Sequence, residues 1–190
     1  DTLERLSDAP AHTTPPLGRP WGWALIGRVY DLGYQSSWPA AGFLGATLYV
    51  WGGDGGGASQ VLASADNGAS WTSVQSNVPP RSWGAGAVFD GKLWLVGGEG
   101  CADTWTSTDG QTWTQVDAGS DWGPRAGHRL QVFDGRLHLL GGIRNQQLMG
   151  DVWRLGDDGR WTQIAAQAFA PRMHPTVGAI GGQLVVTGGA

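Results

Sequence analysis

A pair of adjacent glycines closes an apolar run at four places in this chain, and this repeat constrains the fold more than any other feature. The pairs are Gly52-Gly53, Gly97-Gly98, Gly141-Gly142 and Gly188-Gly189, and their first glycines lie 45, 44 and 47 residues apart. A period of about 40 to 50 residues indicates a repeat architecture, in which each unit stacks on its neighbours to bury a continuous core.

The pattern of apolar runs within each repeat unit predicts four short strands and no helix. In the second unit, two apolar runs at 85–89 and 93–96 flank Asp90-Gly91, a dipeptide that favours a type I′ hairpin turn. Two further strand-like runs follow at 103–107 and 113–116, and the third unit repeats the scheme. Four antiparallel strands in about 45 residues form the blade of a β-propeller. The sequence therefore predicts an all-β fold.

The units also resemble a known repeat family. An Arg at the head of the first strand, an Asp-Gly hairpin, an apolar strand ending in Gly-Gly and a later Trp together resemble the kelch motif over about residues 36–190. We interpret the recurring residues as structural, and we expect each Arg to tie neighbouring blades through hydrogen bonds to backbone carbonyls. These recurring residues are Arg81, Arg125, Arg172, Trp71, Trp113 and Trp161.

A second resemblance overlies the first. The segment from Ser64 to Trp71 is similar to the Asp-box hairpin of sialidases and other propellers, and a version one residue shorter runs from Ser107 to Trp113. The resemblance implies a folding element on the outer hairpin of a blade, away from the ligand face.

The repeat predicts one domain of about four kelch-like blades, the last of them incomplete. We expect blades at 36–80, 81–124 and 125–171 and a half blade at 172–190. Residues 1–35 would supply a possible ring-closing strand at 2–8, followed by an insertion. Two explanations stay open: the chain is a fragment of a larger propeller, or it is a partial propeller completed by self-association.

Composition narrows the classes of partner. The formal net charge is −4 and Lys92 is the only lysine. A nucleic-acid-binding face needs clustered Lys and Arg, so we expect no nucleic-acid partner. No apolar run approaches the roughly 18 residues of a membrane span. His128 and His174 have no spaced carboxylate partner, so we expect no metal and no cofactor. The many tryptophans and the Asp-box favour a bacterial secreted or cell-surface protein.

The candidate ligand-binding residues come from the loops expected on one face and from the insertion. Aromatic rings beside a few charged and amide groups suit a sugar or a peptide. These candidates are Trp21, Trp23, Asp54, Glu99, Asp121, Trp122, Arg144 and Asn145. We therefore expect a non-catalytic binding or scaffold module whose ligand is a protein segment or a glycan.

Two alternatives to this function remain. One is a carbohydrate-active enzyme, similar to a sialic-acid mutarotase or a sialidase, with Arg125 and Glu99 as the acid–base pair. The other is an assembly unit with no ligand. Tyr is absent beyond Tyr49 and Glu4 and Glu99 are the only glutamates, so a sialidase nucleophile pair has few candidates.

Overall fold

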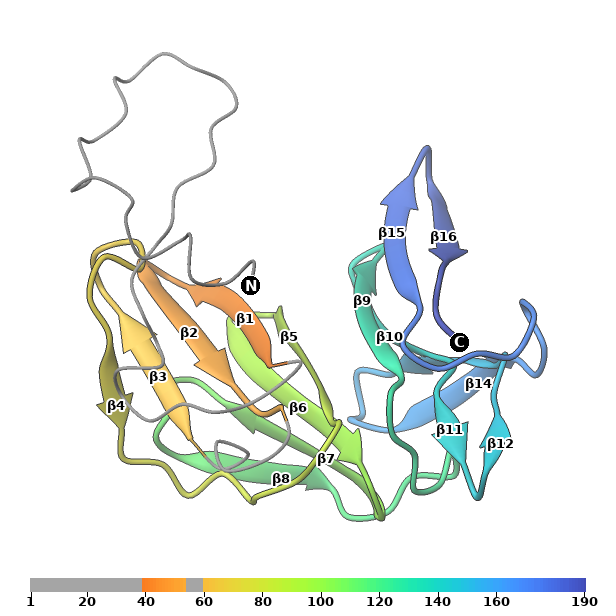
Figure 1. The fold of residues 1–190 in the computed structure, drawn as a ribbon, viewed down its shortest axis with the longest axis horizontal. Coiled ribbons are helices and arrows are strands. Elements are labelled where there is room, and N and C mark those ends of the chain that lie inside the picture. Colours follow the sequence, from red (N-terminus) through yellow and green to blue (C-terminus); the bar gives the residue numbers. More distant parts are fainter. Residues whose placement is uncertain (1–38, 54–59) are drawn as a thin grey trace, which may run out of the picture.

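The computed structural model describes residues 39–53 and 60–190, and every regular element in these ranges is a β-strand. The sheets follow one another along the chain (Figure 1). The first contains β1 (Ala40–Leu44), β2 (Thr47–Trp51), β3 (Val61–Ser64) and β4 (Thr72–Val74), and the second contains β5 (Ala85–Phe89), β6 (Lys92–Gly98), β7 (Cys101–Ser107) and β8 (Trp113–Asp117).

The third sheet contains β9 (Arg129–Phe133), β10 (Arg136–Leu140), β13 (Val152–Leu155) and β14 (Trp161–Ala165). A small hairpin of β11 (Ile143–Arg144) and β12 (Gln147–Leu148) lies in the loop between β10 and β13. The last sheet contains β15 (Thr176–Ile180) and β16 (Gln183–Thr187). All pairings are antiparallel and join strands in chain order, which is the arrangement of propeller blades.

The first strands of successive sheets contact one another: β1 contacts β5, β5 contacts β9, and β9 contacts β15. The hairpin that joins the first two strands depends on residues that tolerate positive φ. Asp90 and Gly91 have φ of 49° and 65°, and Asp134 and Gly135 have φ of 48° and 63°. A type I′ turn needs positive φ at both central positions, so these dipeptides fix the register of their hairpins.

The glycine doublets provide one set of backbone hydrogen bonds between neighbouring repeat units. The second glycine of a doublet donates to the Arg that opens the next unit, from Gly98 N to Arg125 O at 3.0 Å and from Gly142 N to Arg172 O at 2.9 Å. Gly97 and Gly98 both have positive φ, and a Cβ on Gly98 would lie 2.9 Å from Ser82 O. Only residues without a side chain allow this approach.

Each pair of neighbouring four-stranded sheets encloses its own hydrophobic cluster. Trp51, Leu93, Leu95 and Trp113 fill the space between the first two sheets. The second and third sheets enclose another cluster, composed of Trp94, Val96, Trp122, Leu137, Leu139, Trp153, Leu155 and Trp161. An indole fully buried in this way removes on the order of 200 Å² from water.

Indole hydrogen bonds also cross between the sheets. Trp51 Nε1 donates to Trp94 O at 3.0 Å, and Trp161 Nε1 donates to Thr104 Oγ1 at 3.0 Å. The tryptophans therefore fix the orientation of each sheet on the next as well as burying apolar area, because each bond needs a defined geometry.

The fold class expected from the sequence is confirmed: the described chain is all β and has the blade topology of a propeller. The expected strand at 2–8 and the insertion after it lie outside the described residues. The blade boundaries placed at residues 80, 124 and 171 stay a prediction. No helix in the described ranges has the length and apolar character to cross a membrane.

Candidate functional site

The recurring arginines bind within their own sheets. Their Nη1 atoms donate to the carbonyl of the first doublet glycine, 16 residues ahead, at 3.0 Å from Arg81 to Gly97, 3.1 Å from Arg125 to Gly141 and 2.8 Å from Arg172 to Gly188. This corrects the expectation that each guanidinium ties neighbouring blades. The backbone carbonyl of the Arg makes that link instead, by accepting from the preceding doublet.

Two of these arginines also form bidentate ion pairs with an aspartate at the start of the third strand. Arg125 Nη1 and Nη2 lie 2.7 and 2.9 Å from the Asp151 carboxylate oxygens, and the two side chains are 0% and 2% exposed. Arg81 binds Asp103 in the same way. The matching indole of the third strand, on Trp105 or Trp153, donates to the same carboxylate at 2.7 Å.

The pKa of Asp103 reflects this environment. Partial burial raises the pKa, but hydrogen bonds from Arg81 and Trp105 and the charge of Arg81 outweigh burial, so the pKa lies below its usual value. Asp103 is therefore ionised at neutral pH, and the Arg81–Asp103–Trp105 cluster links three parts of one sheet.

The contacts of Arg125 bear on the enzymatic alternative. Its Nε donates to Trp122 O at 3.3 Å, its Nη2 donates to the same carbonyl at 2.8 Å, and the remaining donors bind Gly141 O and Asp151. A guanidinium has five N–H donors. All five are used inside the sheet, so none points at a substrate.

Trp122 does not have the surface position expected of a ligand-binding aromatic. Its side chain is 0% exposed and packs edge-on against Trp161, with 6.5 Å between ring centroids. Arg144 lies over this segment and donates from Nη1 to Trp122 O at 3.3 Å. Trp122 and Arg144 therefore hold the loop before Arg125 in place.

The other candidates divide between two regions and the undescribed part of the chain. Trp21, Trp23 and Asp54 lie outside the described residues. Asp121 is exposed and lines a hollow beside β8 and the turn before β14. Glu99 and Asn145 are exposed and line a common hollow of about 290 Å³ with Pro124 and Gln146. This last hollow brings residues of different loops together.

Trp83, which the sequence analysis did not single out, forms one wall of the Glu99 hollow. The side chain is 38% exposed, and the residue has a φ of 58°. Positive φ is uncommon for a bulky residue and costs about 1–3 kcal/mol. Such backbone strain is concentrated at binding and active sites.

The same backbone conformation recurs two residues after each described Arg of the repeat. Gly127 and His174 are the counterparts of Trp83, and their φ values are 62° and 51°. The Trp83 and His174 rings meet edge to face, with centroids 5.9 Å apart and an interplanar angle of 77°. A Cβ on Gly127 would lie 3.1 Å from the His174 ring, so the glycine leaves room for that ring.

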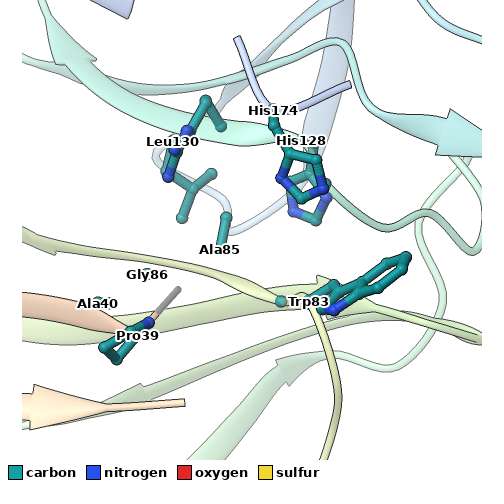
Figure 2. Close-up of a pocket in the computed structure, with 11 residues that line it drawn as sticks. Pro39, Ala40, Trp83, Ala85, Gly86, His128, Leu130 and His174 are labelled. Atoms are coloured by element: carbon teal, nitrogen blue, oxygen red, sulfur yellow. The ribbon is translucent and has the colours of Figure 1, made fainter. Parts of the chain in front are cut away.

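Trp83 and His174 also line a second, smaller pocket of about 70 Å³ where the first strands of the sheets begin. Figure 2 shows Trp83, His128 and His174 around this pocket, with Pro39 and Ala40 at the start of β1. Arg129 lines it as well and donates from Nε to Pro175 O at 2.9 Å. The exposed indole thus lies between a pocket lined by His128, Arg129 and His174 and a hollow that contains a carboxylate and two amides.

His128 is fixed in its neutral form at this pocket. Burial, and then the nearby charge of Arg125, lowers the pKa of His128 to about 3. Its Nε2 lies 3.1 Å from Val96 O, and because a carbonyl only accepts, this nitrogen carries the proton. In the described ranges no three His, Cys, Asp or Glu side chains are grouped so as to hold a metal ion.

The strand order and the stacking of the sheets define a β-propeller. Residues 41–124 match the family model of the DUF6242 beta propeller domain. Among solved structures, the chain is similar to the one titled "Structure of YjhT", with a TM-score of 0.70 and 16% sequence identity. That alignment covers 81% of this chain and 59% of the YjhT chain. No curated protein matches the sequence.

Proposed function

We propose that this chain is a non-catalytic propeller module that binds a glycan on its loop face, with the Trp83 indole as the stacking surface. The observation that carries the proposal is the half-exposed Trp83, which is held in a strained backbone conformation between two hollows lined with polar groups. A rigid indole presents a large apolar face at a low cost in conformational entropy. The C–H face of a pyranose ring packs well against such a surface.

The groups around the indole suit the hydroxyls of a sugar. Asn145 and Gln146 occupy the turn between β11 and β12, at φ of 48° and 65°, and both are exposed next to Trp83. Their side-chain amides offer donors and acceptors, and the exposed carboxylate of Glu99 accepts. Polar groups of both kinds on the rim of an aromatic platform fix the orientation of a small ligand.

A protein segment is the other ligand that the sequence favoured, and the hollow supports it less well. An extended peptide binds by adding main-chain hydrogen bonds to a strand edge or by filling successive side-chain pockets. The Trp83 region offers one aromatic surface and turn residues rather than a strand edge. The carbohydrate enzyme is also less well supported, because all five Arg125 donors are engaged inside the sheet.

We further infer that the repeat units are of the kelch type and that Ser64–Trp71 is an Asp-box. Support for the first is the shared network of the repeat Arg, the doublet carbonyl and the third-strand Asp. Support for the second is the bonding of Asp66, whose Oδ1 accepts from Ser70 N at 2.8 Å and from Ser64 Oγ at 2.7 Å. The hydrogen bond from the Ser70 hydroxyl to Asp66 Oδ2, followed by these two bonds, lowers the pKa of Asp66 to about 2.

The experiment is a glycan array followed by titration calorimetry on the best ligand. Trp83→Gly is the informative variant, because the repeat itself has Gly127 at this position and glycine removes the strain at φ 58°. We expect at least a tenfold loss of affinity with an unchanged or higher Tm. Phe43→Ala is the matched control, because Phe43 is 50% exposed and lies in the first sheet outside both hollows.

Two results would contradict the proposal. One is a glycan that binds the wild type and Trp83→Gly with equal affinity, because the Trp83 indole would then make no contribution to binding. The other is turnover of a sugar that Glu99→Gln abolishes, which would restore the enzymatic alternative. An array without any glycan ligand, combined with a peptide-library hit that Trp83→Gly weakens, would replace the glycan with a protein segment.

A further inference from the structure

The hollow beside Trp83 is built by loops of the second and third four-stranded sheets, and backbone hydrogen bonds hold these loops in place. Glu99 N donates to Ser82 O at 2.9 Å, which fixes the loop between β6 and β7 beside the indole. Ala126 and Ile143 exchange two bonds, of 3.0 and 2.9 Å, which attach the β11–β12 hairpin to the segment before β9. The walls are thus positioned before a ligand arrives, which lowers the entropy cost of binding.

The hollow carries one uncompensated negative charge. Among the described residues, Glu99 and Arg125 are the charged side chains that line it. The charge of Arg125 is balanced by Asp151 inside the sheet, whereas Glu99 is exposed and forms no ion pair in the described ranges. Arg144 follows a wall residue, but its Nη1 donates to Trp122 O and the side chain does not line the hollow. A cation therefore meets a carboxylate here that no neighbouring cation neutralises.

The other walls of the hollow are largely apolar and aromatic. Pro124, Ala126 and Ile143 line it, and the Trp83 indole is 38% exposed beside them. Apolar walls displace water, so the attraction between a carboxylate and a cation is screened less than on an open surface. An ammonium group near the face of an indole is also attracted by the ring quadrupole. An indole and a carboxylate in one hollow therefore favour a positively charged group.

We propose that the glycan bound at Trp83 contains a hexosamine with an unacetylated amino group, and that its ammonium enters this hollow. The inference rests on the proposed function, because it takes the sugar ring to be stacked on the indole. The ammonium donates to the Glu99 carboxylate and lies within cation–π range of Trp83. At about 290 Å³ the hollow is small for a ligand pocket and suits one substituted sugar ring. The amides of Asn145 and Gln146 then bind the hydroxyls.

The same residues disfavour two related classes of sugar. N-acetylation removes the positive charge of the amine, so the ion pair with Glu99 is lost. A sugar carboxylate would meet the negative charge of Glu99 at short range, and all donors of Arg125 are engaged inside the sheet. Glu99 is therefore the residue that selects the amine, whereas Trp83 binds the sugar ring whatever its substituent.

The test compares a short glucosamine oligomer with the same oligomer in its N-acetylated form, each titrated by calorimetry against the full chain. We expect the amine form to bind about tenfold more tightly, and Glu99→Gln to reduce this ratio to about threefold or less. Trp83→Gly should weaken the binding of the amine form at least as much. Added salt should weaken the amine form more than the acetylated form, because salt screens the attraction to Glu99.

Asp134→Asn is the matched control, because it removes the same charge from a position outside the hollow. Asp134 is exposed in the turn between β9 and β10, where its φ is 48° and Asn before a glycine is favoured. A protein with a net charge of −4 attracts any cationic oligomer to some extent, and this variant measures that general attraction. We expect Asp134→Asn to keep the wild-type ratio of affinities.

Four outcomes overturn the inference, and they separate it from the proposed function. If the acetylated form binds as tightly as the amine form and Trp83→Gly weakens it, the glycan site stands without its selectivity for an amine. If Asp134→Asn lowers the ratio as much as Glu99→Gln, the attraction is general. If neither oligomer binds, the amine selectivity is wrong, and the glycan array decides the proposed function by itself. If a lysine-containing peptide binds through Trp83 and Glu99 and no sugar does, both proposals are wrong.

Discussion

The buried Arg125–Asp151 pair makes the most direct prediction about stability. Changing Asp151 to Asn leaves a guanidinium that is 0% exposed without its counter-charge. Removing one partner of a buried ion pair costs about 3–5 kcal/mol, since the remaining charge stays desolvated. The same change at Asp157 should cost far less, because Asp157 is 84% exposed and its partner Arg136 is 40% exposed, so water screens their attraction.

The assay is urea unfolding followed by tryptophan fluorescence, with the wild type, Asp151→Asn and Asp157→Asn compared at pH 7. A double variant, Arg125→Met with Asp151→Asn, should lose less than the sum of the single changes, because it removes both charges at once. Equal costs for Asp151→Asn and Asp157→Asn would refute the reasoning, and so would strict additivity in the double variant.

The first repeat unit shows how such a pair can be replaced. By alignment on the doublet, Ser36 occupies the Arg position. Gln60, which immediately precedes β3, occupies the Asp position. The charged partners are thus both absent, and Leu62 replaces the Trp. Both charged residues of the pair are thus replaced together in this unit, as expected if an unpaired buried Arg or Asp destabilises the fold.

Two further predictions follow from the packing around the doublets. Gly97→Ala should destabilise the protein by more than about 2 kcal/mol in the same urea assay, because φ of Gly97 is 57° and the new Cβ would lie 2.8 Å from His128 Cε1. Gly178→Ala is the control and should be close to neutral, because open space surrounds Gly178. A neutral Gly97→Ala would contradict the steric argument. Acidification from pH 6.5 towards 3 should lower stability by up to about 1.4 kcal/mol per pH unit through His128, because the unfolded chain then binds a proton that the folded chain excludes. The stability that neutral His128 contributes is fully present above pH 6.5 and is lost as the pH falls. This loss should be missing from the profile of unfolding free energy against pH of His128→Gln. An identical profile for both proteins would show that His128 does not titrate in this way.

Much of the fold could be predicted from the sequence because its signals are local. Asp90-Gly91 fixes a turn through two φ angles, and the doublets mark positions where a Cβ is not tolerated. Strands at 85–89 and 113–116 were placed within a residue of β5 and β8. The β11–β12 hairpin was not predicted, because its Asn145-Gln146 turn has no glycine to indicate positive φ.

The candidate site was harder to predict because it depends on contacts between distant segments. Trp83 lies two residues after Arg81, and no residue type nearby signals its φ of 58°. Trp122 was expected on the surface since it lies in a loop, yet the loop folds back over the core between two sheets. The aspartate partners stand 22 and 26 residues after their arginines, so a fixed period did not align them, although the shared Asp-X-Trp spacing could have found them.

The bond from each doublet to the next Arg has a consequence for how such chains change length. At two junctions, Gly98–Arg125 and Gly142–Arg172, the doublet of one unit donates a backbone hydrogen bond to the Arg of the next unit, between the same positions of the repeat. In-frame duplication or deletion of a whole unit of about 45 residues can therefore preserve this bond at the new junction. A change in the number of units can thus keep the backbone connection that links a doublet to the following Arg.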